Sequence, residues 1–87
     1  MNGLEILISK LPVKDEITAG KDYIFNDYVL FVKIYNFLDN TTLVSKNSPQ
    51  SYLTEEDCHV EFDADDFVVI LEGDFEKDNY VLKITES

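Results

Sequence analysis

Residues 58–71 read CHVEFDADDFVVIL, and the fold is predicted from this stretch outward. Cys58, Val60 and Phe62 alternate with polar residues, a period of two that is typical of a strand with one buried face. The run at 67–71 is rich in β-branched residues and indicates a second strand. Apolar alternation returns at 80–84. We therefore expect the last two segments to pair as a hairpin across the loop between them.

The N-terminal segment also has a strand-like pattern. Leu4, Ile6 and Ile8 alternate with their neighbours, which favours a strand over 4–9. The segment 12–19 stays open between a short helix and an extended edge, because its Pro and the Gly that follows it suit either structure.

The middle of the chain is aromatic and β-branched almost throughout. This composition predicts strands near 22–26 and 28–38, the second of them apolar on both faces. Such a strand must be covered twice, either in a filled core or in a subunit contact, and we expect a filled core and a monomer rather than a homodimer. The pair Asp39-Asn40 then predicts a two-residue turn into a strand over 41–45.

These segments together predict one small domain over 1–87, since a chain of 87 residues is too short for two hydrophobic cores. Hydrophobic residues make up 45% of the chain, which is enough to drive folding. The expected fold class is mainly β, or α+β, with six to eight short strands in an antiparallel sandwich or barrel and at most one short helix.

Two stretches resemble immunoglobulin-like sandwiches: ITAGKDYIF at 17–25 and NYVLKIT at 79–85. The resemblance implies an immunoglobulin-like topology but carries no catalytic residue. The chain lacks the Trp and the Cys pair of antibody domains, since Cys58 is its one cysteine. The resemblance therefore informs the fold and not the function.

The charge is strongly negative, with 18 Asp and Glu against seven Lys and no Arg, for a net charge of -11. This balance argues against direct binding to nucleic acid or to an anionic membrane, both of which need clustered cations. Apolar runs of four residues are far below the roughly 20 that a membrane helix needs, so we expect a cytoplasmic protein.

Nearly all of the excess charge lies in residues 55–78, which hold eleven acids and one Lys. Two series within this segment have alternating spacing: Glu61, Asp63 and Asp65, then Glu72, Asp74, Glu76 and Asp78. On extended backbone each series would place carboxylates about 6.6 Å apart on one face. We expect the two series to form one exposed, continuous negative surface. The spacing is about twice the phosphate rise along one DNA strand.

This pattern predicts an inhibitor that blocks a basic nucleic-acid-binding protein or nuclease by mimicking the charge of DNA. In composition the chain is similar to phage-encoded DNA mimics, including anti-CRISPR proteins, and to acidic nuclease immunity proteins. Phe62, Phe67 and Phe75 interleave with the acids as candidate apolar anchors. The predicted partner-binding residues are Glu55, Glu56, Asp57, Glu61, Asp63, Asp65, Asp66, Glu72, Asp74, Phe75, Glu76 and Asp78. The alternative is an immunoglobulin-like structural or adhesion module, such as a virion component, whose acids are only a solvated edge.

The sequence supports an enzyme or a cofactor-binding protein less well than an interaction protein. Cys58 and His59 are adjacent on a strand and so point to opposite faces, which separates a thiol nucleophile from its base. Asp74-x-Glu76-x-Asp78 resembles the start of a calcium-binding loop, but Thr85 stands where the bidentate Glu should be. We therefore expect no catalytic residue, no metal ligand and no cofactor.

Overall fold

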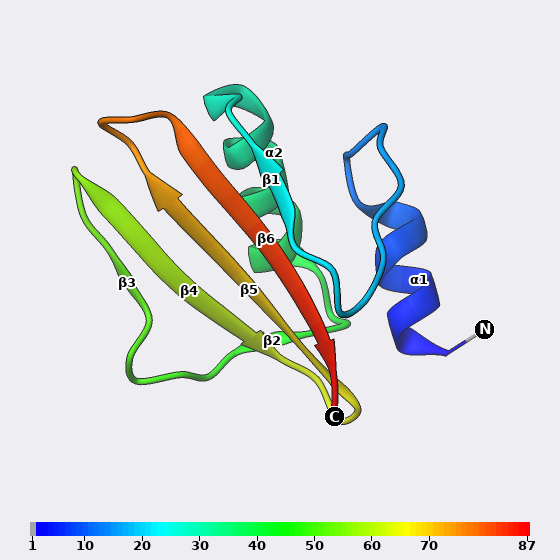
Figure 1. Ribbon diagram of the computed structural model, residues 1–87. Helices are drawn as coiled ribbons and strands as arrows, with labels where there is room; N and C mark the ends of the chain where they lie inside the picture. Colours follow the sequence, from blue (N-terminus) through cyan, green and yellow to red (C-terminus); the bar gives the residue numbers. More distant parts are fainter. Residues whose placement is uncertain (1) are drawn as a thin grey trace.

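The computed structural model describes residues 2–87. It contains one antiparallel sheet and two helices (Figure 1). The sheet order is β1-β6-β5-β4-β2, and β3 pairs with β4 beyond the end of β2. The strands are β1 (Tyr23–Phe25), β2 (Ser45–Lys46), β3 (Tyr52–Leu53), β4 (Asp57–Asp63), β5 (Phe67–Asp74) and β6 (Asn79–Glu86), and the helices are α1 (Gly3–Lys10) and α2 (Tyr28–Asn40).

The centre of the sheet is the meander β4-β5-β6, which confirms the strands and the hairpin predicted from 58–84. Along β5 every second residue is buried, beginning with Phe67, because alternate side chains point to opposite faces. The predicted fold class, mainly β or α+β, is confirmed in its α+β form. The second layer is helical, however, where a sandwich would have a second sheet, and residues 2–87 form two helices instead of at most one.

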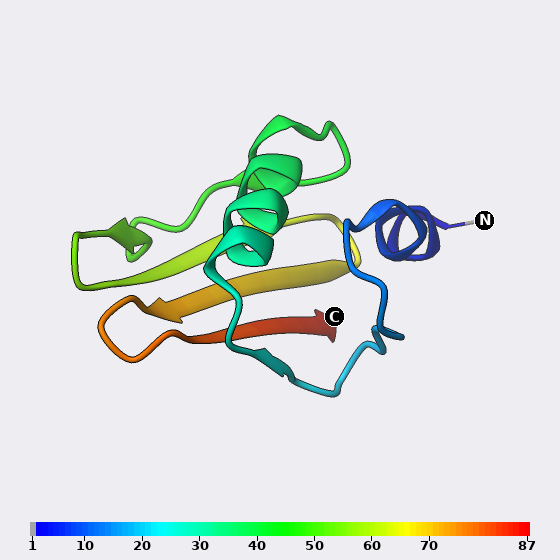
Figure 2. The same cartoon turned by 90° about the horizontal axis from the view of Figure 1, so that it is seen from above.

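The predicted strand over 28–38 is wrong, because this segment is the helix α2. Asp27 begins it: its Oδ1 accepts hydrogen bonds from the backbone N–H groups of Val29 and Leu30 at 2.9 and 3.2 Å. The buried residues Phe31, Ile34 and Leu38 recur at helical spacing and pack on the sheet. Burial of this stripe outweighs the weak β preference of its aromatic and β-branched residues. The helix crosses one face of the sheet (Figure 2).

The predicted strand over 4–9 is also a helix, α1. Asn2 caps it by accepting a hydrogen bond from the backbone N–H of Glu5 at 2.8 Å. Leu4 and Leu7 are its buried residues, and the spacings of three and four residues that join them to buried Leu11 are helical and decide against the alternation. This helix lies beside the end of the sheet at which β6 ends (Figure 2).

Two shorter predictions need correction as well. Asp39 and Asn40 are the last residues of α2 and not a hairpin turn. The strand expected over 41–45 is wrong except at Ser45, which begins β2. The segment 12–19, which the sequence left open, forms neither a helix nor a strand. The strand expected near 22–26 is confirmed as β1.

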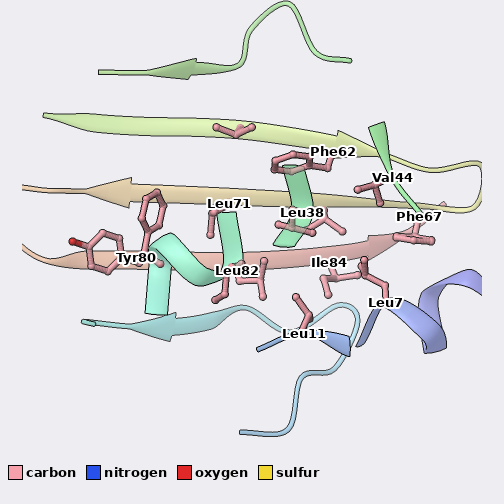
Figure 3. Packing of buried hydrophobic residues seen from close by; sticks show 14 of the residues in the cluster. Leu7, Leu11, Leu38, Val44, Phe62, Phe67, Leu71, Tyr80, Leu82 and Ile84 are labelled. Carbon is pink, nitrogen blue, oxygen red and sulfur yellow. The ribbon is translucent and has the colours of Figure 1, made fainter. Parts of the chain in front are cut away.

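The core lies between the helices and one face of the sheet (Figure 3). Phe62 and Phe67 are each 1% exposed and Tyr80 is fully buried, so the first two are core residues and not the partner anchors that the sequence suggested. A buried side chain of this size contributes about 1.5–3 kcal/mol. The other face of the sheet, here called the open face, carries no helix and holds the half-buried alternate residues of β4, β5 and β6.

Candidate functional site

Six carboxylates gather at the end of the sheet where β4 begins and β5 ends. Asp57 is the direct cross-strand partner of Asp74, and the backbone N–H of Phe75 donates to the carbonyl of Glu56 at 2.9 Å. This end therefore joins the segment before β4 to the turn after β5. The residues of this acidic end are Glu55, Glu56, Asp57, Asp74, Glu76 and Asp78.

The turn between β5 and β6 folds back on the carboxylate of Asp74. Its Oδ1 accepts hydrogen bonds from the backbone N–H groups of Glu76 and Lys77, both at 3.1 Å. Asp78 has a φ of 52°, a left-handed conformation that Asp tolerates. The series 72–78 is therefore not one extended ladder, and the expectation of evenly spaced carboxylates along it is wrong.

The segment before β4 is held by Thr54. Its hydroxyl accepts hydrogen bonds from the backbone N–H groups of Glu56 and Asp57 at 3.1 and 3.0 Å. It also donates to Asp57, whose Oδ1 and backbone carbonyl oxygen both lie 3.0 Å from it. Glu55 and Glu56 are thereby fixed at the backbone while both residues stay exposed.

On the open face, the acids of the two series alternate with other groups. Glu61, Asp63 and Glu72 all lie there half-buried, where the sequence predicts solvent-exposed residues. His59 interrupts them, since its Nε2 lies 3.1 Å from Oε1 of Glu61 and its Nδ1 lies 3.2 Å from Oε2 of Glu72. Lys83 Nζ contacts the other oxygen of Glu72 at 2.8 Å. Cations thus offset part of the negative charge of this face.

These contacts change the ionisation of the groups that make them. The hydrogen bond to Glu61 raises the pKa of His59 above its usual value, and Glu72 adds to the effect. The hydrogen bond from Lys83 lowers the pKa of Glu72. An imidazolium has two N–H donors and so satisfies both carboxylates, whereas neutral imidazole satisfies one. His59 shares its face of β4 with Glu61, as the strand alternation predicts, and is part of an ion network with Glu61 and Glu72.

Asp65 and Asp66 lie apart from the acidic end. They occupy the turn between β4 and β5, which is at the opposite end of the sheet from the turn between β5 and β6. The backbone carbonyl of Asp66 accepts from the N–H of Ser87, so this turn lies beside the C-terminal residue. The predicted single negative surface is thus divided into an acidic end, a mixed open face and a separate acidic turn.

A groove of about 390 Å³ adjoins the acidic end. One wall is α2, the other is the segment from β3 to β4, and Phe75 from the turn after β5 lies between them. We call this the aromatic groove, and its lining residues are Tyr28, Phe31, Val32, Tyr35, Leu53, Thr54, Glu55 and Phe75.

Aromatic contacts shape the floor of this groove. The ring of Phe31 meets that of Phe75 edge to face at a centroid distance of 5.3 Å and stacks on buried Tyr80 at 5.0 Å. Tyr28 and Leu53 form the rims and remain 54% and 53% exposed. Phe75 is half-buried, because its ring packs on Phe31 on one side and faces the groove on the other. The side chains of Tyr28 and Leu53 leave apolar surface in contact with water.

The sequence did not identify this groove. On the strand expected over 28–38, Tyr28 would lie on the opposite face from Phe31 and Tyr35, and only a helix places all three on one side. The signal that was available is the polar spacing of Lys33, Asn36 and Asn40, all of which are exposed on α2.

Residues 2–87 assemble neither a cysteine nucleophile beside a base nor a cluster of metal ligands. Cys58 is 3% exposed, and burial raises the pKa of its thiol to about 11. His59 points to the opposite face of β4, as the strand pattern predicted. Among residues 2–87, no three His, Cys, Asp or Glu side chains converge closely enough to hold a metal ion.

Comparison with known proteins gives no further guidance: no family model, no curated protein and no solved structure matches this chain. Within the described part of the chain, neither helix is long and apolar enough to cross a membrane.

Proposed function

We propose that this chain is an interaction protein that occupies a basic, nucleic-acid-binding surface of another protein and so inhibits it. The observation that carries the proposal is the placement of the acidic end beside the aromatic groove. Six carboxylates and one cation, Lys77, lie in the two segments that meet there. A surface of this kind attracts a positively charged partner and offers it apolar contact area at the same place.

The geometry changes the form of the mimicry hypothesis. The regular spacing of carboxylates is lost in the turn after β5, so the likeness to a DNA backbone reduces to the local density of charge. Density alone is enough to steer a basic surface toward the acidic end, because steering depends on the summed field rather than on register. All acids of the acidic end except Asp74 are exposed. Glu55, Glu56 and Glu76 are best suited to this role, because the carboxylates of Asp57 and Asp78 accept hydrogen bonds from Thr54 and Tyr80.

The test is a comparison of two triple charge reversals. One variant carries Glu55→Lys, Glu56→Lys and Glu76→Lys at the acidic end. Its matched control carries Asp65→Lys, Asp66→Lys and Glu86→Lys at the opposite end of the sheet, where all three residues are also exposed. Both change the net charge by the same amount. Circular dichroism melts establish that each variant is folded.

Proteins captured from the native host on immobilised wild-type protein serve as the partners. We expect the acidic-end variant to lose capture of nucleic-acid-binding proteins and the control to retain it. We also expect capture to weaken as salt rises and duplex DNA or RNA to displace the captured protein. Equal capture by both variants, or simultaneous binding of nucleic acid and this chain to one target, would refute the proposal and favour the structural module.

A further inference from the structure

We infer that the aromatic groove binds an Arg side chain presented by the basic partner, an inference that rests on the proposed function. The groove lies open to solvent between two apolar rims, Tyr28 and Leu53. Its volume of about 390 Å³ falls within the roughly 300–1,000 Å³ of ligand-binding pockets. An extended side chain with an apolar stem fits between such rims.

The charge of the groove selects a cationic group. Of the described residues that line it, one is a carboxylate, Glu55, and none is a Lys. Glu55 is exposed at the mouth and continues into Glu56 and Asp57. A cation entering here meets aromatic faces inside and carboxylates at the mouth, and both attract it.

The aromatic walls favour guanidinium over ammonium. Guanidinium is planar, stacks on aromatic rings, bonds a carboxylate through two parallel N–H groups and is weakly hydrated. Lys has a compact and strongly hydrated charge, so it loses more when it leaves water. Arg is also among the residues that dominate binding at protein interfaces. The exposed ring of Tyr28 offers the stacking surface, and Glu55 offers the carboxylate.

The experiment compares hexa-arginine with hexa-lysine, two peptides of equal charge, by calorimetry and by amide chemical-shift mapping of the whole protein. We expect hexa-arginine to bind about threefold to tenfold more tightly. Its shift changes should centre on Leu53, Glu55 and Phe75.

Two variants separate the groove from the charge around it. Tyr28→Leu keeps an apolar side chain but removes the ring, so it should reduce the preference for hexa-arginine to less than about twofold. Val29→Ala is the control, because Val29 is 60% exposed on the same helix and does not line the groove. It should leave both affinities unchanged.

Equal affinity of the wild-type protein for the two peptides overturns the inference, as does a preference that Tyr28→Leu leaves intact. Neither result touches the proposed function, since charge-dependent capture by the acidic end is measured separately. Equal capture by the two triple reversals, with the arginine preference of the wild-type protein retained, would reject the proposed function and keep the groove as an Arg-binding site.

Discussion

Asp57 and Asp74 are direct cross-strand partners on β4 and β5, two like charges at the position where neighbouring side chains lie closest. Each carboxylate is tied to its own turn. Thr54 donates to Asp57, and two backbone N–H groups donate to Asp74. The turns thus stabilise a pair of acids that would otherwise weaken the sheet, and the acidic end keeps its charge density as a result.

Charge and hydrogen bonding at Asp74 can be separated by substitution. Asp74→Ala should lower the free energy of unfolding by about 1 kcal/mol, because two backbone N–H groups lose their acceptor. Asp74→Asn keeps the Oδ1 acceptor and removes the repulsion with Asp57, so it should be as stable as the wild type or slightly more stable. Urea denaturation measures both, and equal destabilisation by the two variants would contradict the assignment.

The ion network of His59 makes stability depend on pH. The pKa of His59 is raised in the folded protein, so its contribution is complete below its usual value of 6.5 and is lost as the pH rises through the folded value. The pKa of Glu72 is lowered, so its contribution is present above its usual value of 4.5 and is lost as the pH falls.

The two contributions overlap between about pH 4.5 and 6.5. We therefore expect His59→Gln to lower Tm most in this window and least at pH 8 and above. Thermal melts of both proteins at half-unit pH steps test this. A Tm difference that stays constant from pH 5 to 8 would show that the imidazolium does not stabilise the fold.

Gly73 lies in β5 because Tyr80 fills the space above it. A Cβ at this position would lie 2.9 Å from Cδ1 of Tyr80 and 3.3 Å from Sγ of Cys58. Gly73→Ala should therefore destabilise the protein by about 1–3 kcal/mol, since Tyr80 is fully buried and cannot move aside. Gly3→Ala is the control. Its nearest atom is 3.7 Å away, and it should be neutral or stabilising by chemical denaturation.

The start of α2 depends on Asp27. Asp27→Ala removes the acceptor for two backbone N–H groups and should cost about 0.5–2 kcal/mol, whereas Asp27→Ser should restore most of the loss. Thermal unfolding followed at 222 nm distinguishes them. An Ala variant as stable as the Ser variant would mean that packing alone positions the helix.

The meander was predictable because each of its strands has one buried face. Along β4, Cys58, Val60 and Phe62 are buried between half-buried polar residues, and no helical spacing competes with this alternation. The long strands and their hairpins follow from such local patterns, which is why the fold class could be predicted.

The helices could not be predicted from apolar periodicity, because their apolar residues fit both the two-residue period of a strand and the roughly 3.6-residue period of a helix. Leu4 pairs with Ile6 in an alternating pattern and with Leu7 in a helical one, and only packing against the sheet decides between them. The caps Asn2 and Asp27 are the local signals for a helix, and Asp27 is followed by aromatic and β-branched residues that favour a strand. The aromatic groove depends on α2, so it could not be predicted without the helix.

The sequence predicts which acidic residues hold the excess charge, but it does not predict how they are arranged on the surface. Acidic residues spaced two apart lie on one face only where the backbone is extended. The backbone turns after Asp74, so the spacing does not predict where the acids beyond it lie. Glu55 and Glu56 come to lie beside this turn through the hydrogen bond from Phe75, a long-range contact that no local pattern contains.

Cys58 gives this protein an intrinsic reporter of its own opening. The chain has one sulfhydryl, and in the folded state it is shielded on β4 next to Gly73 and held in its unreactive protonated form. A thiol-directed label therefore reacts only with molecules in which the central strands have separated. The labelling rate thus measures the free energy of that separation in the unmodified chain, with and without a bound partner.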